Sequence, residues 1–129
     1  MSKPRRIQRR RTSGWTLVGA TTNPLGAVIV TRPSRFGNPF TLAGAREWLG
    51  AETSEQAREA CHMAFRSWVR GSDQWWMGPE AAAARRRLLE GLPELRGKDL
   101  ACYCPLPEPG QPDHCHAAVL LDLANGDTP

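Results

Sequence analysis

The chain has 129 residues, a length that suits one domain built around one hydrophobic core. Hydrophobic residues make up 40% of it, with five Trp and three Phe, which argues against a wholly disordered protein. No apolar run approaches the roughly 18 residues of a membrane-spanning helix, so we expect no membrane partner. The first residues lack the apolar segment of a secretory signal, which predicts a cytoplasmic protein.

Positive charge is concentrated at one end of the chain. The net charge is +4, and residues 1–11 hold six basic groups and no acid. The rest of the chain carries all 13 acidic groups and 11 of the 17 basic ones, so it is slightly acidic. We therefore predict a basic arm over residues 1–11, one domain over 12–125 and a short tail over 126–129. Such an arm favours a phosphate-bearing partner, and a solvated tail that aids solubility is the alternative.

Hydrophobic patterning predicts two strands followed by three helices in the first two thirds of the chain. We expect strands over 15–18 and 27–30, and the second is a β-branched apolar run typical of a strand covered on both faces. Helices are expected over 43–49, from the capping box Thr53-Ser-Glu-Gln56 to Gly71, and from Pro79 to a stop at Gly91.

The last third predicts a strand followed by a buried helix. Residues 98–104 have a strand pattern, and residues 117–124 are apolar nearly all round, as a helix covered on every side is. Strand, loop and buried helix make half of a βαβ unit. The fold class we predict is therefore α/β, a single compact domain with a small, mainly parallel sheet flanked by helices, resembling half of a Rossmann fold.

Three of the four cysteines lie close to a histidine late in the chain. Cys102, Cys104, Cys115 and His116 together offer three thiolates and one imidazole, the donors of a tetrahedral zinc site. A second hypothesis makes Cys115 and His116 catalytic, because a thiol at a helix start ionises readily. A third makes the cysteines inert packing residues, which is also our interpretation of Cys61 on its apolar helix stripe.

A second candidate segment follows the strand at 27–30. Its side chains offer positive charge, hydroxyl and amide groups, and a glycine that allows close approach of a ligand. From this segment we select Arg32, Ser34, Arg35 and Gly37 as anion-binding residues and Asn38 as a residue that contacts the reacting group. If the predicted strands over 27–30 and 98–104 are parallel neighbours, the segment after the first and the Cys/His segment after the second emerge at the same sheet edge. Ligands bind at this edge in α/β folds.

Three blocks of sequence occur in a fixed order along the chain. They are residues 6–15, residues 32–40, and residues 95–104 followed by 115–125. These blocks resemble a small bacterial and phage family named domain of unknown function 4326, and the resemblance covers residues 5–125. It implies that the basic arm belongs to the domain. The family name assigns no reaction, so the resemblance supplies candidate positions only.

The leading functional hypothesis is a domain that binds a nucleotide, a nucleoside derivative or nucleic acid, with hydrolase or transferase chemistry at a base or sugar as an extension. In it, Arg5, Arg9 and Arg11 of the arm hold phosphate. The alternative is a non-enzymatic module, stapled by zinc, that binds nucleic acid or protein through the arm.

Overall fold

The computed structural model describes residues 3–126, which form three strands and five helices. In chain order these are β1 (Arg6–Gln8), α1 (Leu17–Ala20), β2 (Ala27–Ile29), α2 (Leu42–Trp48), α3 (Ser54–Val69), α4 (Pro79–Leu95), β3 (Asp99–Cys102) and α5 (His116–Asn125). All but the first residue of the predicted tail lie outside the described range. The strands form one parallel sheet in the order β1-β3-β2, which confirms the predicted fold class.

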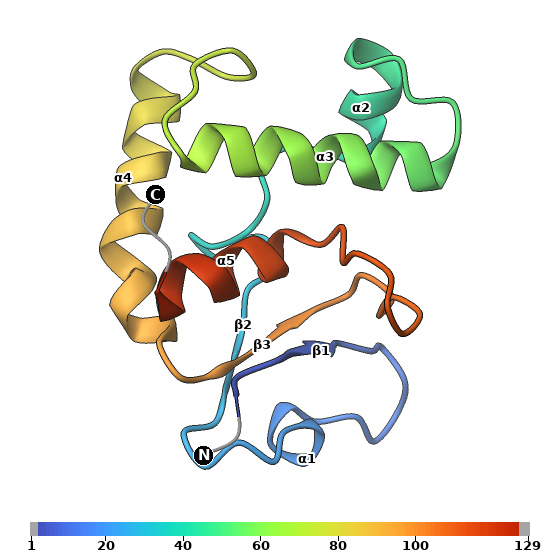
Figure 1. Cartoon of the computed structure of the whole chain (residues 1–129), viewed down its shortest axis with the longest axis vertical. Coiled ribbons are helices and arrows are strands. Elements are labelled where there is room, and N and C mark those ends of the chain that lie inside the picture. The colour runs from blue at the N-terminus through green and yellow to red at the C-terminus, as the bar shows by residue number, and fades with distance from the viewer. Residues whose placement is uncertain (1–2, 127–129) are drawn as a thin grey trace.

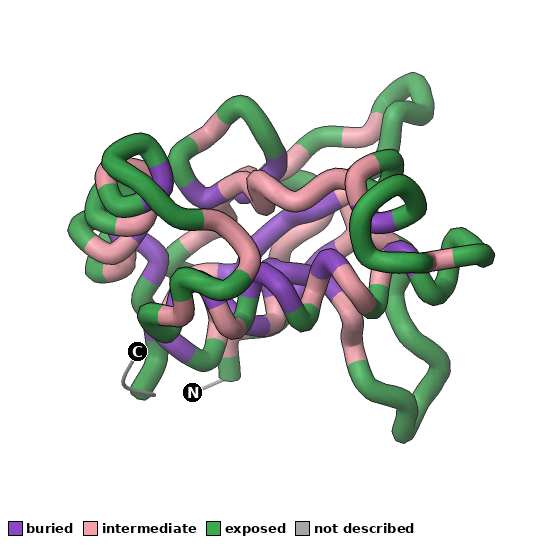
Figure 2. The backbone as a smooth tube through the Cα atoms, turned by 90° about the horizontal axis from the view of Figure 1, so that it is seen from above, coloured by how far each residue is buried: buried purple, intermediate pink, exposed green. Residues whose placement is uncertain are grey.

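The core lies where α5 is enclosed between the sheet and the other long helices. Helix α5 contacts β1 and β3 on one side and α3 and α4 on the other (Figure 1). The side chains of Phe65, Leu88, Leu100 and Leu120 meet there with no exposed surface. Buried segments run through the middle of the molecule and exposed loops surround them (Figure 2). A helix that is apolar nearly all round therefore occupies the covered position predicted for it.

Local sequence explains where the long helices begin. The Thr53 hydroxyl accepts a hydrogen bond from Gln56 N, and the Gln56 side chain accepts one from Thr53 N, so the predicted capping box starts α3. Pro79 opens α4, where its missing N–H costs no hydrogen bond. The helix expected over 43–49 forms as α2, which covers Leu42–Trp48.

The expected strand over 15–18 is wrong, because that stretch leads into helix α1. Thr16 has extended backbone geometry and its hydroxyl accepts a hydrogen bond from Gly19 N, which is an N-cap arrangement. The strand over 27–30 forms as β2, but at an edge of the sheet and only half-buried. Full burial belongs to β3, which is central and two residues shorter at its end than the predicted 98–104.

The predicted helix stop at Gly91 is also wrong, since α4 continues to Leu95. Gly91 is buried inside the helix, and a Cβ on it would lie 2.6 Å from Arg35 Nε and 2.8 Å from Phe36 Cε1. The missing side chain therefore serves close packing of the 32–40 loop against α4, and the helix does not end there.

A buried carboxylate ties the start of the sheet to the segment before β2. Asp99 accepts hydrogen bonds from Arg5 N at 3.0 Å, the Thr21 hydroxyl at 2.7 Å and Asn23 Nδ2 at 3.1 Å. Arg5 was expected to hold phosphate, but its guanidinium lies 3.9 Å from Asp99 at the end of the sheet opposite the cysteines. Arg5 therefore does not join the other candidate residues.

We expect Asp99→Asn to lower the free energy of unfolding by about 1–3 kcal/mol, because an amide NH₂ now faces a donor. Burial raises the pKa of Asp99, but the hydrogen bonds from Arg5 N, Thr21 and Asn23 outweigh burial and hold that pKa below its ordinary value. The carboxylate thus stabilises the fold above about pH 4, and this stability is lost as pH falls through the lower folded pKa. Urea unfolding at several pH values tests this, with the exposed Asp73→Asn as control. Equal stability of Asp99→Asn and wild type would contradict the assignment.

Candidate functional site

A cavity of about 430 Å³ lies at the edge of the sheet where the strands end. It brings the two predicted segments together, since residues from 31–40 and from 102–116 both line it. The lining residues are Arg11, Thr31, Arg32, Asn38, Phe40, Leu42, Arg58, Cys61, Cys102, Tyr103, Cys104, Pro105, His114 and His116. Parallel pairing of β1 and β2 with β3 is what delivers the three following segments to one edge.

Thiols and an imidazole converge on one point beside this cavity. The ligand atoms of Cys102, Cys115 and His116 all lie within 4.8 Å of one another, and the three residues are buried. Cys104 Sγ lies 3.8 Å from Cys102 Sγ, and His116 Nδ1 lies 3.8 Å from Cys115 Sγ and 4.0 Å from Cys102 Sγ. Cys102, Cys115 and His116 can hold a metal ion, which agrees with the first of the three hypotheses for these residues, and Cys104 lies next to this group.

The ring of His116 is fixed in orientation by its second nitrogen. Nε2 lies 2.8 Å from the carbonyl oxygen of Val30, which can only accept a hydrogen bond, so Nε2 carries a proton. In the neutral imidazole Nδ1 is then unprotonated and faces the sulfur atoms. Phe65 packs edge-on against the ring at a centroid distance of 5.3 Å. Hydrogen bonding of the second nitrogen to a backbone carbonyl is the usual support of a metal-binding histidine.

The three clustered thiols do not ionise alike. Hydrogen bonds from the Cys104 and Cys115 thiols lower the pKa of Cys102 far below its ordinary value and outweigh the effect of burial. The hydrogen bond to Cys102 raises the pKa of Cys104 to about 11, because with the help of burial it outweighs the lowering effect of the Cys115 thiol. The pKa of Cys115 is raised still further by its hydrogen bonds to Cys102 and Cys104 and by burial. The Cys102 thiolate is thus favoured, and the Cys104 and Cys115 thiols both donate hydrogen bonds to it. Ionisation of Cys104 or Cys115 as well needs a bound cation to stabilise the added negative charge.

Arg6 forms hydrogen bonds with residues at both ends of the loop between Cys104 and Cys115. Its guanidinium donates to the carbonyl oxygens of Cys104 and Pro105 at 2.8 Å and forms a two-bond ion pair with Asp113. The Arg6 side chain is only 3% exposed. Sequence reasoning missed this role because Arg6 is surrounded by exposed arginines, and only the pairing of β1 with β3 buries it.

The cavity wall carries positive charge. Arg11, Arg32 and Arg58 line it, and the described residues around it include no acidic side chain. Arg11 Cζ lies 4.1 Å and Arg9 Cζ 4.7 Å from the centre of the Tyr103 ring. Arg11 thus lines the cavity, whereas Arg9 contacts Thr31 and the Tyr103 ring and is not one of the lining residues. Arg58, on α3, was not among the predicted residues, because its position on the helix surface gives no signal in the sequence.

The other residues of the 32–40 segment have structural contacts. Asn38 lines the cavity, but its amide donates to Cys61 O at 3.2 Å and accepts from Phe40 N at 2.9 Å. The Ser34 hydroxyl accepts from Phe36 N. A Cβ on Gly37 would lie 2.8 Å from the Arg32 backbone. The missing side chain of Gly37 therefore makes room for the Arg32 backbone, and not for a bound anion.

Two further predicted residues lie away from the cavity. Arg35 forms an ion pair with Glu94 and lies over the Phe36 ring, so it contacts α4 instead of lining the cavity. Cys115 is 1% exposed and does not line the cavity either, which argues against its action as a nucleophile on a ligand held there.

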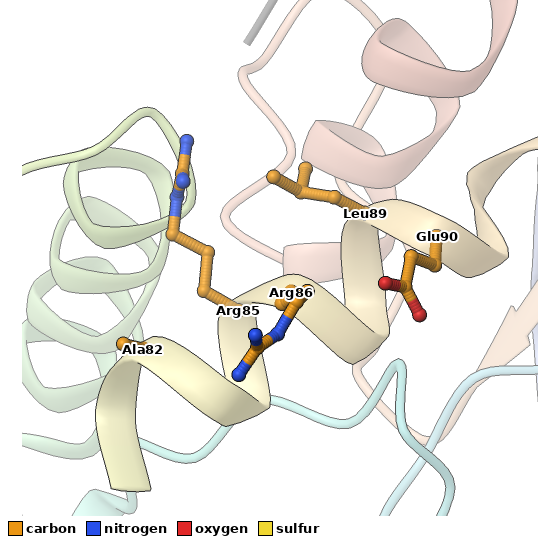
Figure 3. Close-up of a pocket in the computed structure, with 5 residues that line it drawn as sticks. All are labelled: Ala82, Arg85, Arg86, Leu89 and Glu90. Carbon is orange, nitrogen blue, oxygen red and sulfur yellow. The ribbon is translucent and has the colours of Figure 1, made fainter. Parts of the chain in front are cut away.

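A larger but open hollow of about 550 Å³ lies along α4. It is formed by Ala82, Arg85, Arg86, Leu89 and Glu90, all from one helix, and Figure 3 shows the side chains of Arg85 and Arg86 pointing in different directions. The Arg85 guanidinium donates to Val69 O at 2.9 Å and so connects α4 to the end of α3. No set of polar groups converges there, and the sheet-edge cavity is the better candidate.

A model of the family described as domain of unknown function (DUF4326) matches residues 7–126, nearly the whole chain. The chain belongs to this family. The matched range includes Cys102, Cys104, Cys115 and His116, so the Cys/His cluster is part of the DUF4326 domain of this protein. Searches of curated proteins and of solved structures found no match. Within residues 3–126, no helix combines the length and apolar character needed to cross a bilayer.

Proposed function

We propose that this domain binds a nucleotide or a related phosphorylated nucleoside in the cavity at the sheet edge. The observation that carries the proposal is the charge of the lining, which includes three arginines and no described acidic residue. Guanidinium groups form paired, charge-assisted hydrogen bonds with phosphate oxygens. A cavity with three guanidinium groups in its lining attracts an anion.

The other lining residues suit the organic part of such a ligand. Phe40 and Tyr103 offer ring surfaces, and Asn38 retains one amide N–H beyond its bond to Cys61 O. The volume of about 430 Å³ is within the range of small-molecule sites, which favours a free nucleotide or a chain end over a duplex. Hydrolysis or group transfer at the base or sugar stays a prediction of the sequence.

The Cys/His cluster supports a second part of the proposal, a zinc ion held by Cys102, Cys104, Cys115 and His116. Two sulfur ligands placed 2.3 Å from zinc at the tetrahedral angle lie about 3.8 Å apart. The Cys102–Cys104 separation of 3.8 Å equals this value. His116 Nδ1 lies 3.8 Å from Cys115 Sγ and 4.0 Å from Cys102 Sγ, a few tenths of an ångström beyond the roughly 3.6 Å expected for a sulfur and a nitrogen ligand. Thiolate and imidazole donors select zinc over magnesium or calcium, which prefer oxygen.

A non-enzymatic, zinc-stapled module that binds nucleic acid is the second candidate, and the exposure of the basic segment at Arg10 and Arg11 favours it. The two candidates differ in their salt dependence. A module that neutralises several phosphates along a strand loses about a thousandfold in affinity between about 50 and 200 mM salt. A cavity that holds one nucleotide loses much less.

Substitution of the cavity arginines tests the leading proposal. We expect Arg32→Ala and Arg58→Ala each to weaken nucleotide binding about 10-fold or more, because each removes a charge-assisted hydrogen bond to phosphate. Calorimetric titration of the zinc-loaded protein with the four ribonucleoside 5′-monophosphates measures this effect.

Arg87→Ala is the matched control, since Arg87 is exposed on α4 and does not line the cavity. An equal loss of affinity in Arg87→Ala would show a diffuse charge effect and count against the cavity. Absence of binding by the wild-type protein would remove the proposal.

A further inference from the structure

His116 connects the Cys/His cluster to the wall of the cavity that carries Arg32. Its Nε2 donates to Val30 O at 2.8 Å, and Val30 is followed directly by Thr31 and Arg32, which line the cavity. The Thr31 hydroxyl also accepts from Arg9 Nη1 at 2.7 Å. An ion bound at Nδ1 fixes the ring, and the ring fixes the backbone at the end of β2 from which this wall begins.

Tyr103 connects the same cluster to Arg11, another lining residue of the cavity. It lies between Cys102 and Cys104 in the chain, and Arg11 Cζ is 4.1 Å from the centre of its ring. Cation–π attraction at this distance holds the guanidinium over the ring. When the Cys102 and Cys104 thiolates bind one ion, they hold the backbone of Tyr103 between them. Because the Arg11 guanidinium lies over the Tyr103 ring, the position of the ring then sets the position of Arg11.

With Cys104, whose Sγ lies 3.8 Å from Cys102 Sγ, as the fourth ligand beside Cys102, Cys115 and His116, the donor set closes the coordination sphere. Four protein ligands fill a tetrahedral zinc site, and sites of this kind are structural, whereas catalytic sites keep one position open. Cys102, Cys104 and His116 line the cavity, whereas Cys115 is 1% exposed and does not line it. No coordination position is then left for a ligand that enters the cavity.

We propose that zinc loading controls the affinity of the cavity for phosphate, with Val30 and Tyr103 as the connections and without contact between the ion and the ligand. This inference rests on the proposed function and adds regulation to it. The zinc-loaded form presents Arg11 and Arg32 in fixed positions, and the metal-free form presents them on unrestrained segments. Because zinc orders these segments before the ligand arrives, ligand binding no longer includes the free-energy cost of ordering them.

The decisive experiment compares zinc-loaded and metal-free protein as binders of inorganic phosphate and of ribonucleoside 5′-monophosphates. We expect the zinc-loaded form to bind about 10-fold tighter or more, and saturating nucleotide to raise zinc affinity by the same factor. Arg58→Ala should weaken binding in both forms, because α3 carries none of the proposed zinc ligands. Equal, measurable affinity in the two forms overturns this inference and leaves the proposed function intact. Absence of binding in both forms overturns both.

Two measurements on metal-loaded protein keep the test valid if the metal-free form unfolds. Tyr103→Ala should retain zinc and lose as much phosphate affinity as Arg11→Ala, with the double variant no worse than either, because both changes break one connection. Unchanged phosphate affinity in Tyr103→Ala overturns the inference. With cobalt(II) in place of zinc, saturating nucleotide should leave the visible spectrum of the tetrahedral ion unchanged. A changed spectrum shows that the ligand reaches the ion, and this too overturns the inference.

Discussion

The affinity of the Cys/His cluster for zinc should rise about 100-fold for each pH unit between about pH 7 and 9. Zinc binds thiolates, so it competes with protons at every cysteine that is still protonated. Hydrogen bonds from Cys104 and Cys115 lower the pKa of Cys102, so this thiol loses its proton before the other two do. The pKa of Cys104 is raised to about 11 and that of Cys115 is raised further, so zinc displaces one proton from each. Higher pH lowers the concentration of protons that compete with zinc. Since two protons are displaced, zinc affinity changes a hundredfold for each pH unit.

Competition against a chromophoric chelator at several pH values measures this slope. Cys61→Ser is the matched control, because Cys61 is a buried cysteine packed with Ala45 and Ala57 outside the group of metal-binding side chains. It should bind zinc with unchanged affinity and slope. A thousandfold change per pH unit would show that Cys102 is protonated before zinc arrives. A flat profile would show that the thiols are not ligands.

The elements that follow from short-range chemistry could be predicted from the sequence. The capping box at Thr53 and Gln56 places the start of α3, and the apolar composition of residues 117–124 places α5 in the core. Gly91 shows the limit of such rules. A glycine near a helix end resembles a stop, and only the approach of Arg35 and Phe36 reveals that the absent side chain makes room for packing.

At the candidate site too, some features follow from the local sequence and others depend on contacts between distant residues. The residue types of Cys102, Cys104, Cys115 and His116 indicate a metal site as one of three interpretations, and the structure brings the ligand atoms of Cys102, Cys115 and His116 within 4.8 Å of one another. The partner of His116 is Val30 O, 86 residues away in the chain, and no local pattern predicts a hydrogen bond of that separation.

Arg6 is the clearest case of information that only tertiary structure contains. In the sequence it is one of several arginines in a basic segment, and charge density predicts solvent or phosphate as its partner. Pairing of β1 with β3 buries it beside the loop from Cys104 to Asp113, and its charge neutralises a carboxylate. The arm is thus divided between Arg6, which is structural, and Arg11, which follows β1 and lines the cavity.

We expect Arg6→Met to lower the free energy of unfolding by about 3 kcal/mol, because it leaves Asp113 without its partner and two carbonyl groups without donors. The expected loss is at the low end for a broken buried pair, since the Asp113 side chain is 21% exposed. The same change should weaken zinc binding about 10- to 100-fold, as loss of a group that supports metal ligands does. Urea unfolding with excess zinc and competition against a chelator measure the two effects.

Arg10→Met is the matched control, because Arg10 is exposed and its described hydrogen bond is to Gln8 two residues away. It should change neither quantity. Asp113→Asn in the Arg6→Met background should restore part of the stability, since it removes the charge left unpaired. It should not restore zinc affinity, because the carbonyl groups of Cys104 and Pro105 still lack the guanidinium that positions them. Recovery of both quantities together would show that Arg6 acts only by neutralising Asp113 and does not position the metal ligands.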